Sequence, residues 1–149
     1  MIALVESRLT IRRLQDPHEA HLCAQLMASS EPWTTLRRNY ENCFKAVNDP
    51  NREVYVALQE NDFSGFVILN LRGAFLGYIQ SIAVVPERRN QRIGRQLIAF
   101  SEDHIFRMSP NVFLCVSSFN KSAQRFYTRL GYQRIGEMND YVVKDIRRF

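Results

Sequence analysis

Cysteine is scarce in this chain of 149 residues, and Cys23, Cys43 and Cys115 lie far apart without a CxxC pair. Their odd number and wide spacing exclude a disulfide framework or a zinc knuckle as the organising principle. Long apolar runs are absent as well. The longest uncharged stretch, residues 73–86, has 14 residues, whereas a bilayer-crossing helix needs roughly 20. Glu6 follows only five residues, so the start of the chain does not resemble a secretory signal.

Glycine-based nucleotide signatures are also missing, because the six glycines form neither GxxxxGK[ST] nor GxGxxG. No internal repeat, helix-turn-helix, RRM or zinc pattern is visible. His18 and His21 stand three residues apart without a third ligand, and His104 has no evident partner, so no metal site is expected. We therefore expect one cytoplasmic domain over residues 1–149, with neither a membrane nor a nucleic acid as partner.

Positive charge is present in excess, and its position is more informative than its total. Lys and Arg number 20 against 15 Asp and Glu, which gives a net charge of +5. Residues 86–95 carry four arginines and one glutamate, a local excess of +3. Such a basic loop favours a phosphate-bearing ligand, either a nucleic acid or a nucleotide cofactor, and an ordinary solvated surface is the alternative.

Hydrophobic periodicity predicts alternating helices and strands in the first part of the chain. A strand is expected over residues 7–14, followed by a helix with Asp16 as its N-cap. A second helix, capped by Thr34 or Thr35, is expected to run to about residue 47. Short turns then join three strands into an antiparallel meander, at residues 53–59, 65–71 and 77–85.

The second part of the chain continues this mixed pattern. We expect a helix over 92–107, a buried strand over 111–116, a helix over 120–130 closed by Gly131, and strands at 132–136 and 141–146. The order is β-α-α-β-β-β-α-β-α-β-β. It predicts an α+β domain with a single mixed, mostly antiparallel central sheet flanked by helices.

The passage from the strand at 77–85 into the helix at 92–107 carries the strongest site signal. The strand ends at Pro86, the basic loop follows, and the helix then begins. Free backbone N–H groups at a helix N-terminus, its positive dipole end and nearby arginines suit a pyrophosphate. Gly94 would let the backbone approach that phosphate closely.

Two motifs in this half of the chain resemble a known family. Val84-x-Pro86-x-x-Arg89-x-x-Arg92-x-Gly94 is similar to the acetyl-CoA loop of the GNAT N-acetyltransferase superfamily, with its pattern [Gln/Arg]-x-x-Gly-x-[Gly/Ala]. The run from Asn120 through Ala123, Phe126 and Tyr127 to Leu130-Gly131-Tyr132 resembles the helix that follows the fifth strand in these enzymes. The motifs occur in the family's order, and the resemblance covers nearly the whole chain.

The resemblance implies an N-acetyltransferase that moves the acetyl group of acetyl-CoA to a primary amine of a small molecule or peptide by direct attack in a ternary complex. It implies that the fourth and fifth strands splay apart, so that pantetheine pairs with the backbone of Ile82 and Val84. Tyr127 takes the general-acid position; a core aromatic is its alternative. The other cofactor-binding residues are then Arg89, Asn90, Gln91, Arg92, Ile93, Gly94, Arg95 and Asn120, the last of which is also a plausible N-cap.

The sequence departs from the family in two places. Arg92 stands where the first glycine is usual, and its side chain either crowds the pyrophosphate or adds a charge-assisted contact. The usual strand glutamate that serves as general base is missing, because the fifth-strand position holds Cys115, interpreted as a small buried apolar residue. Water or Glu31 is then left to take the proton of the amine.

The resemblance also places Glu31 and Trp33 where relatives contact the acceptor, although Trp33 is equally well explained as a hydrophobic staple. Two other function classes stay open. Arg92 and the missing glutamate are compatible with a CoA-binding regulatory module without activity, and the arginine loop is compatible with a nucleic-acid-binding domain. The identity of the acceptor amine and the choice between monomer and homodimer are left open by the sequence.

Overall fold

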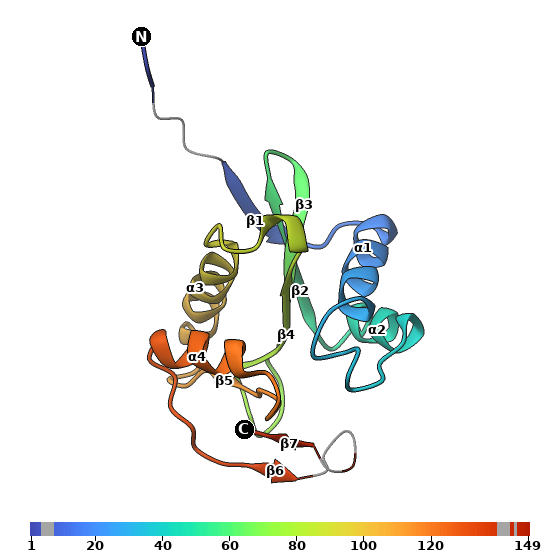
Figure 1. Cartoon of the computed structure of the whole chain (residues 1–149), viewed down its shortest axis with the longest axis vertical. Coiled ribbons are helices and arrows are strands. Elements are labelled where there is room, and N and C mark those ends of the chain that lie inside the picture. The colour runs from blue at the N-terminus through green and yellow to red at the C-terminus, as the bar shows by residue number, and fades with distance from the viewer. Residues whose placement is uncertain (4–7, 140–143, 145) are drawn as a thin grey trace.

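A five-stranded sheet organises the computed structural model, which describes residues 1–3, 8–139, 144 and 146–149 (Figure 1). The strands follow the order β1-β2-β3-β4-β5. Three neighbouring pairs are antiparallel, and β4 with β5 is parallel. The strand bounds are β1 Leu9–Arg13, β2 Glu53–Gln59, β3 Asp62–Asn70, β4 Tyr78–Val84 and β5 Phe113–Leu114. The predicted mixed, mostly antiparallel sheet is confirmed.

The β2–β3 hairpin is tighter than the sequence indicated. β3 begins at Asp62 rather than at residue 65, because Glu60 and Asn61 both adopt positive φ angles of 52° and 69°. Two consecutive residues of this kind make the short turn that suits the twist of paired strands. The meander itself is as predicted.

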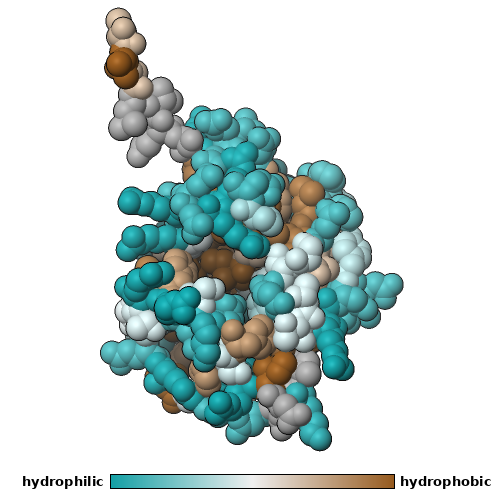
Figure 2. All heavy atoms as spheres, viewed as in Figure 1, coloured by the Kyte–Doolittle hydropathy of each residue, from teal (hydrophilic) through white to brown (hydrophobic). Residues whose placement is uncertain are grey.

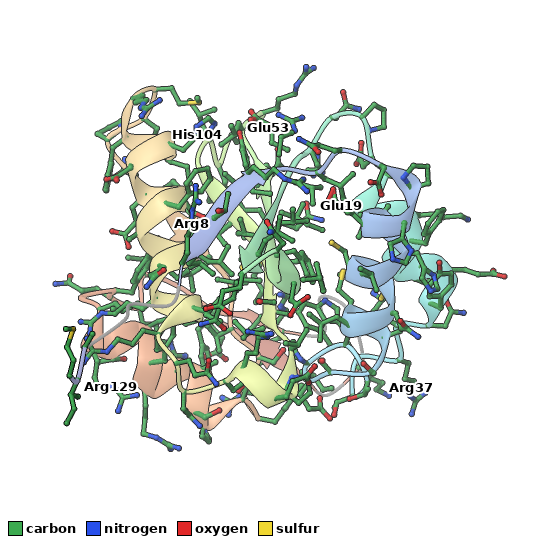
Figure 3. All side chains as sticks on the ribbon, turned by 90° about the horizontal axis from the view of Figure 1, so that it is seen from above. Arg8, Glu19, Arg37, Glu53, His104 and Arg129 are labelled. Carbon is green, nitrogen blue, oxygen red and sulfur yellow. The ribbon has the colours of Figure 1, made fainter. Side chains whose placement is uncertain are left out.

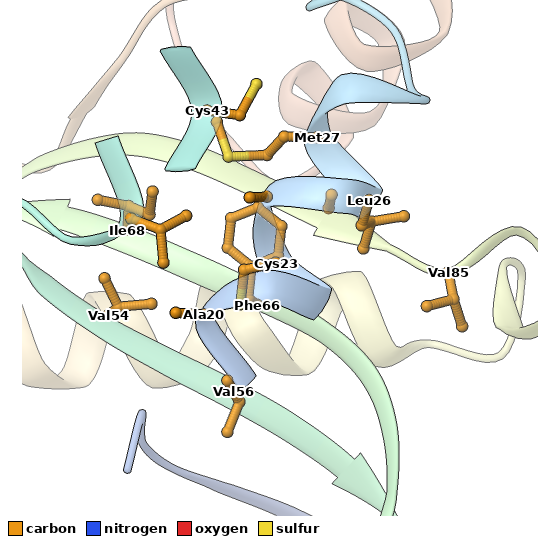
Figure 4. Packing of buried hydrophobic residues seen from close by; sticks show 13 residues of the cluster. Ala20, Cys23, Leu26, Met27, Cys43, Val54, Val56, Phe66, Ile68 and Val85 are labelled. Carbon is orange, nitrogen blue, oxygen red and sulfur yellow. The ribbon is translucent and has the colours of Figure 1, made fainter. Parts of the chain in front are cut away.

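Helices cover both faces of the sheet. α1 (Pro17–Ala28) and α2 (Tyr40–Val47) lie on one side, and α3 (Ile93–Phe106) and α4 (Lys121–Arg129) on the other (Figure 1). Side chains of a strand alternate between the two faces. Phe66 and Ile68 therefore pack with Cys23 and Met27 under α1 (Figure 4), whereas the intervening residues of β3 pack beneath α3.

Of the N-caps predicted for the first two helices, one was correct and one was wrong. Asp16 caps α1 as expected, and its carboxylate accepts a hydrogen bond of 2.9 Å from Glu19 N. Neither Thr34 nor Thr35 caps α2, because residues 31–37 form turns and the Thr35 hydroxyl donates to Glu31 over 2.9 Å. Asn39 is the actual cap, in a reciprocal pair with Asn42.

Polar side-chain contacts attach a helix to the sheet on each side. Arg12 of β1 donates two hydrogen bonds, of 3.0 and 2.9 Å, to Glu19 of α1, and this contact lowers the pKa of Glu19. Glu53 of β2 lies 3.3 Å from His104 Nε2 of α3 and accepts 2.6 Å from Tyr55 Oη (Figure 3). The expectation that His104 has no partner was therefore wrong.

The end of the chain differs most from the sequence expectation. Gly131 closes α4 with a φ of 95° as predicted, but residues 132–136 form no strand. A separate two-stranded sheet is made by β6 (Met138–Asn139) and β7 (Arg147–Arg148). The strand expected over 141–146 falls mostly outside the described residues. The strand expected over 111–116 shrinks to two residues, because β5 soon leaves its neighbour.

No helix in the described part of the chain is long and apolar enough to cross a bilayer. The same residues contain no group of three or more His, Cys, Asp or Glu placed to hold a metal ion. His21 instead bonds to Tyr40, with 2.8 Å between Nδ1 and Oη.

Candidate active site

β4 and β5 separate after a short stretch of pairing. Their parallel ladder joins only Tyr78 with Phe113 and Ile79 with Leu114. Beyond it a cavity of about 300 Å³ opens between the strands, which we call the inter-strand cavity. In the space-filling view a hollow near the middle of the molecule has an apolar floor and polar side chains around its rim (Figure 2). The edge of β4 that faces β5 is thus open beyond Ile79, in agreement with the predicted splay.

Segments far apart in the sequence line the inter-strand cavity. They are the turn region after α1, α2, the first residues of β4, the end of β5 with the chain after it, α4 and the end of the chain. The structure therefore brings together five predicted residues, Glu31, Trp33, Ile82, Asn120 and Tyr127, and others that were not predicted, among them Arg38, Ser117 and Arg148.

Tyr127 contributes a phenol to this cavity from the last turn of α4. Its ring packs edge-on against those of Phe126 and Tyr132, with centroids 5.2 and 5.7 Å away. Among the described residues its hydroxyl has no hydrogen-bond partner. Burial raises the pKa of Tyr127 to about 12, because the charged phenolate is poorly solvated there. The hydroxyl therefore keeps its proton at neutral pH.

Asn120 serves as the N-cap of α4 and also lines the inter-strand cavity. Its Oδ1 accepts hydrogen bonds of 3.3 Å from Ala123 N and from Ser122 Oγ. The capping interpretation of this residue is thus confirmed. Its position at the cavity leaves the proposed cofactor contact as a second role for the amide.

A second cavity, of about 430 Å³, lies at the N-terminus of α3. We call it the arginine-loop cavity; its lining includes Val84, Asn90, Arg92, Gly94, Arg95 and Arg129. α3 begins at Ile93 without a side-chain cap, so the first N–H groups of the helix are available to a ligand. A Cβ added at Gly94 would meet nothing nearer than 3.8 Å, so the glycine leaves room for a ligand and is not demanded by the fold.

Arg92 occupies the left-handed region, with φ 66° and ψ 9°, immediately before α3. Glycine adopts this conformation without strain, whereas a residue with a Cβ does not. The backbone at this position thus has the conformation that glycine favours, although the residue is arginine. Gln96 N donates to Arg92 O over 3.0 Å, which fixes the start of the helix.

The loop arginines divide into two pairs. Arg88 bonds to Gln59 and to Asp62, and Arg89 Nε donates to Val84 O over 3.0 Å. Arg92 and Arg95 have no side-chain partner within the described chain. The second pair is therefore free to meet an anion, while Arg88 and Arg89 line the same cavity but are hydrogen-bonded within the protein.

Other predicted loop residues are distributed unevenly. Asn90, with a φ of 62°, lines the arginine-loop cavity together with Ile93. Gln91 lines neither cavity and bonds instead to Glu87 O at 3.5 Å. Arg129, one turn after Phe126 on α4, lines this cavity and was missed. Its place on the face that meets α3 could have been found from the spacing of the apolar residues of that helix.

Glu31 and Trp33 stand at the mouth of the inter-strand cavity on the side of α1. Hydrogen bonds from Thr34, and then from Thr35, lower the pKa of Glu31. Trp33 is half-buried and packs against the core beneath α1. Glu31 is therefore a persistent negative charge and a weak base.

Cys115 is not the buried apolar residue that the sequence indicated. It is half-buried and lines the inter-strand cavity, because β5 ends at Leu114 and the following backbone turns away from β4. No pattern in the sequence pointed to Ser117, Arg38 or Arg148, which line the same cavity from three separate segments.

Comparisons with known proteins agree with this architecture. The model of the acetyltransferase (GNAT) family matches residues 14–132. A GNAT-family protein from Desulfovibrio desulfuricans superposes with a TM-score of 0.79 at 20% identity, covering 95% of each chain. A protein from Bacillus anthracis assigned as a streptothricin acetyltransferase, in complex with acetyl coenzyme A, gives 0.61 at 26% identity, covering 70% of this chain and 62% of that one.

Sequence comparison adds a curated relative, the aminoalkylphosphonate N-acetyltransferase of Salmonella typhimurium. It is 30% identical over 92 residues, which is 58% of this chain and 60% of the relative. The match thus spans less than two thirds of that protein. The family model, in contrast, extends from the end of β1 to the end of α4 and includes both cavities' principal elements. The chain therefore belongs to the acetyltransferase (GNAT) family.

Proposed function

We propose that this protein transfers the acetyl group of acetyl-CoA to a primary amine, with both substrates bound at once. One observation carries the proposal: the open edge of β4 lies between the inter-strand cavity and the arginine-loop cavity, and α4 lines both. A long cofactor can run along that edge from one cavity to the other. An acceptor can then enter from the side of α1.

The residues of the arginine-loop cavity fit the phosphates of acetyl-CoA. Uncapped N–H groups at the start of α3 supply donors and the positive end of the helix dipole. Arg92 and Arg95 add two guanidinium groups without internal partners, and Arg129 faces the same cavity. The space at Gly94 allows close approach of the backbone. Ile82 and Val84 offer strand backbone to the pantetheine arm.

Acetyl-CoA supplies a thioester, whose carbonyl carbon forms the new bond to the amine nitrogen while its carbon–sulfur bond breaks. Tyr127 holds a proton at neutral pH, since its pKa lies at about 12, and can give it to the departing sulfur. The attacking neutral amine loses one proton to solvent as the amide forms. Solvent then returns one proton to Tyr127, so the protons balance. The residue is thus assigned as the general acid.

We assign removal of the amine proton to water and not to a protein carboxylate. Glu31, the carboxylate at the cavity mouth, has a lowered pKa because of its bonds to Thr34 and Thr35. A weaker base is less able to accept a proton from an ammonium group. Glu31 then acts by attracting the cationic acceptor, and Trp33 forms the adjoining wall of the slot.

The acceptor is proposed to be a small primary amine or the amine of a peptide. The curated relative is named for aminoalkylphosphonates, so this class belongs in the first panel tested. A cytoplasmic protein without nucleic-acid or membrane partners, as monomer or homodimer, completes the proposal.

The test is thiol release from acetyl-CoA in the presence of a panel of amines, with mass spectrometry of the acetylated products. We expect release above the amine-free control for at least one amine. Calorimetric binding of acetyl-CoA without release for any amine would instead support a regulatory module. Absence of acetyl-CoA binding would refute the proposed function altogether.

A further inference from the structure

Two buried polar atoms lack a hydrogen-bond partner among the described side chains: Ser117 Oγ and Arg148 Nε. Ser117 is 1% exposed, so its hydroxyl cannot turn to bulk solvent. Buried polar groups in folded proteins are nearly always paired, and an unpaired one requires an explanation. Both residues line the inter-strand cavity. A ligand in that cavity would supply the missing partner of both atoms.

Backbone pairing holds these two side chains beside one another. Ser117 and Arg148 form an antiparallel bridge. On one side of it Val116 and Phe149 exchange hydrogen bonds of 2.8 and 2.9 Å, and on the other Ser118 N donates to Arg147 O over 2.7 Å. Directly opposed residues of an antiparallel pair project to the same face. The two unpaired groups are therefore parts of one built site.

The chemistry of the pair selects an acceptor of hydrogen bonds. The Nε–H of arginine can only donate and stays charged, and a serine hydroxyl donates readily. Two carboxylates of the protein that could accept these hydrogen bonds have other partners: Glu137 binds Arg134 and Arg147, and Glu31 binds Thr35. A negatively charged oxygen fits both donors at once.

The charge of the cavity points the same way. Its charged lining residues are two arginines, Arg38 and Arg148, and one carboxylate, Glu31. These side chains therefore carry an excess of one positive charge. Arg38 has no side-chain partner in the described chain either. A purely cationic acceptor would find a poor environment at this end of the cavity, whereas an acceptor with an anionic group would find a complementary one.

We infer that the acceptor amine carries an anionic group, a carboxylate, phosphonate or sulfonate, which Arg148 and Ser117 bind. This inference rests on the proposed N-acetyltransferase function and deepens it. The amine end then points toward β4 and Tyr127, and the anionic end toward β7. Arg148 and Ser117 thereby determine which amines are acetylated, although they take no part in the chemical step.

The decisive comparison uses acceptors that differ in charge but hardly in shape. β-Alanine is paired with β-alaninamide, and 2-aminoethylphosphonate and taurine are paired with ethanolamine. We expect kcat/KM to be roughly 10-fold or more higher for the anionic member, as a charge-assisted hydrogen bond in a cavity would give. Equal values within each pair would overturn the inference and leave the proposed function standing.

Arg148→Gln should lower kcat/KM for the anionic acceptors by roughly 10- to 100-fold, with the KM for acetyl-CoA unchanged and little effect on neutral amines. Arg147→Gln is the matched control, because Arg147 precedes it on β7, is exposed, and pairs with Glu137 at 3.5 Å. Equal losses in the two variants would overturn the inference. A raised KM for acetyl-CoA in Arg148→Gln would also overturn the inference, because it would show that Arg148 binds the cofactor and not the acceptor.

Ser117→Ala supplies a readout that separates binding from folding. Removing an unpaired buried hydroxyl removes a desolvation cost, so the melting temperature of the free protein should not fall, while kcat/KM for the anionic acceptors drops several-fold. A fall in melting temperature with unchanged acceptor selectivity would assign the serine a structural role and contradict the inference.

Calorimetry keeps the inference separate from the activity. 2-Aminoethylphosphonate titrated into the protein with CoA present should bind to the parent and to Arg147→Gln, and markedly less to Arg148→Gln. If no amine is acetylated, the proposed function fails, and this binding result still decides whether Arg148 receives an anion. No binding to the parent protein would overturn the inference.

Discussion

The arginine-loop cavity and the inter-strand cavity lie on two sides of the same open strand edge, but they are built differently. The first is formed mainly by one continuous segment, from Val84 to Arg95, with one wall from α4. The second is assembled from residues more than 100 positions apart, such as Glu31 and Arg148. A site that binds by backbone groups can be encoded locally, whereas a site that binds by side chains need not be.

The two cavities also differ in the chemical groups that they present to a ligand. The arginine-loop cavity presents helix N–H groups and guanidinium groups without internal partners, which suit a polyanion of fixed chemistry. The inter-strand cavity is lined by one carboxylate, two arginines, two tyrosines and a tryptophan. Substitutions should therefore affect cofactor affinity in the first cavity, and turnover or acceptor choice in the second.

Tyr127→Phe is expected to have the largest effect. Loss of the proton donor should lower kcat by roughly 10- to 10⁴-fold with little change in acetyl-CoA affinity. Tyr132→Phe is the control, because its hydroxyl donates to Glu102 at 3.4 Å and does not line the inter-strand cavity. Steady-state kinetics and calorimetry check both. A large loss of cofactor affinity in Tyr127→Phe would show that the two cavities are not separable.

The pH dependence should reflect the acceptor and not the acid. Below the pKa of an alkylamine, about 10.4 for a lysine-like group, kcat/KM should rise up to roughly tenfold per pH unit as the neutral amine accumulates. The raised pKa of Tyr127, about 12, keeps its hydroxyl protonated throughout this range. Rates measured from pH 7 to pH 10 should therefore show no falling limb, and a fall there would argue against Tyr127 as the donor.

Gly94→Asp tests the arginine-loop cavity. A carboxylate at the start of α3 would oppose the phosphates, and acetyl-CoA affinity should fall by roughly 10-fold or more. Gly94→Ala adds the same Cβ without charge, at a position where the nearest atoms are 3.8 and 4.0 Å away. Calorimetry should show a much smaller loss for alanine. Unchanged affinity in Gly94→Asp would place the cofactor elsewhere.

Arg92→Gly should have opposite effects on stability and binding. Relief of the left-handed conformation should raise the free energy of unfolding by up to about 1 kcal/mol, measured by denaturant titration. Loss of the guanidinium should weaken acetyl-CoA binding a few-fold, and the difference should shrink at high salt. Tighter binding in the glycine variant would mean that the arginine side chain crowds the cofactor.

Cys115→Ala should change least. Direct transfer in a ternary complex needs no acetyl-enzyme, so kcat should stay within roughly threefold of the parent. Mass spectrometry after incubation with acetyl-CoA alone should show no acetyl group on this residue. A stoichiometric adduct that passes into product would replace the ternary-complex mechanism by a two-step one.

What could be predicted from the sequence follows the same division. Asp16, Gly131 and the β2–β4 meander were correct, because caps and alternation are local signals. The α2 cap was wrong because Thr35 bonds to Glu31 and leaves Asn39 to begin the helix. Arg148 was missed because it reaches the site only through the bridge between β7 and Ser117, a pairing that no short sequence window contains.

The open edge of β4 has a consequence for how the protein behaves at high concentration. An unpaired strand edge on the outside of a molecule is a template on which another chain can add, and proteins guard such edges with charges, prolines or short strands. This edge lines the two cavities, with β5 fixed to one end of it and helices on both faces of the sheet. A ligand of pantetheine's width can reach it, but a second folded sheet cannot. The fold thus keeps a backbone surface of β4 available for binding beside a strand that is already paired at one end.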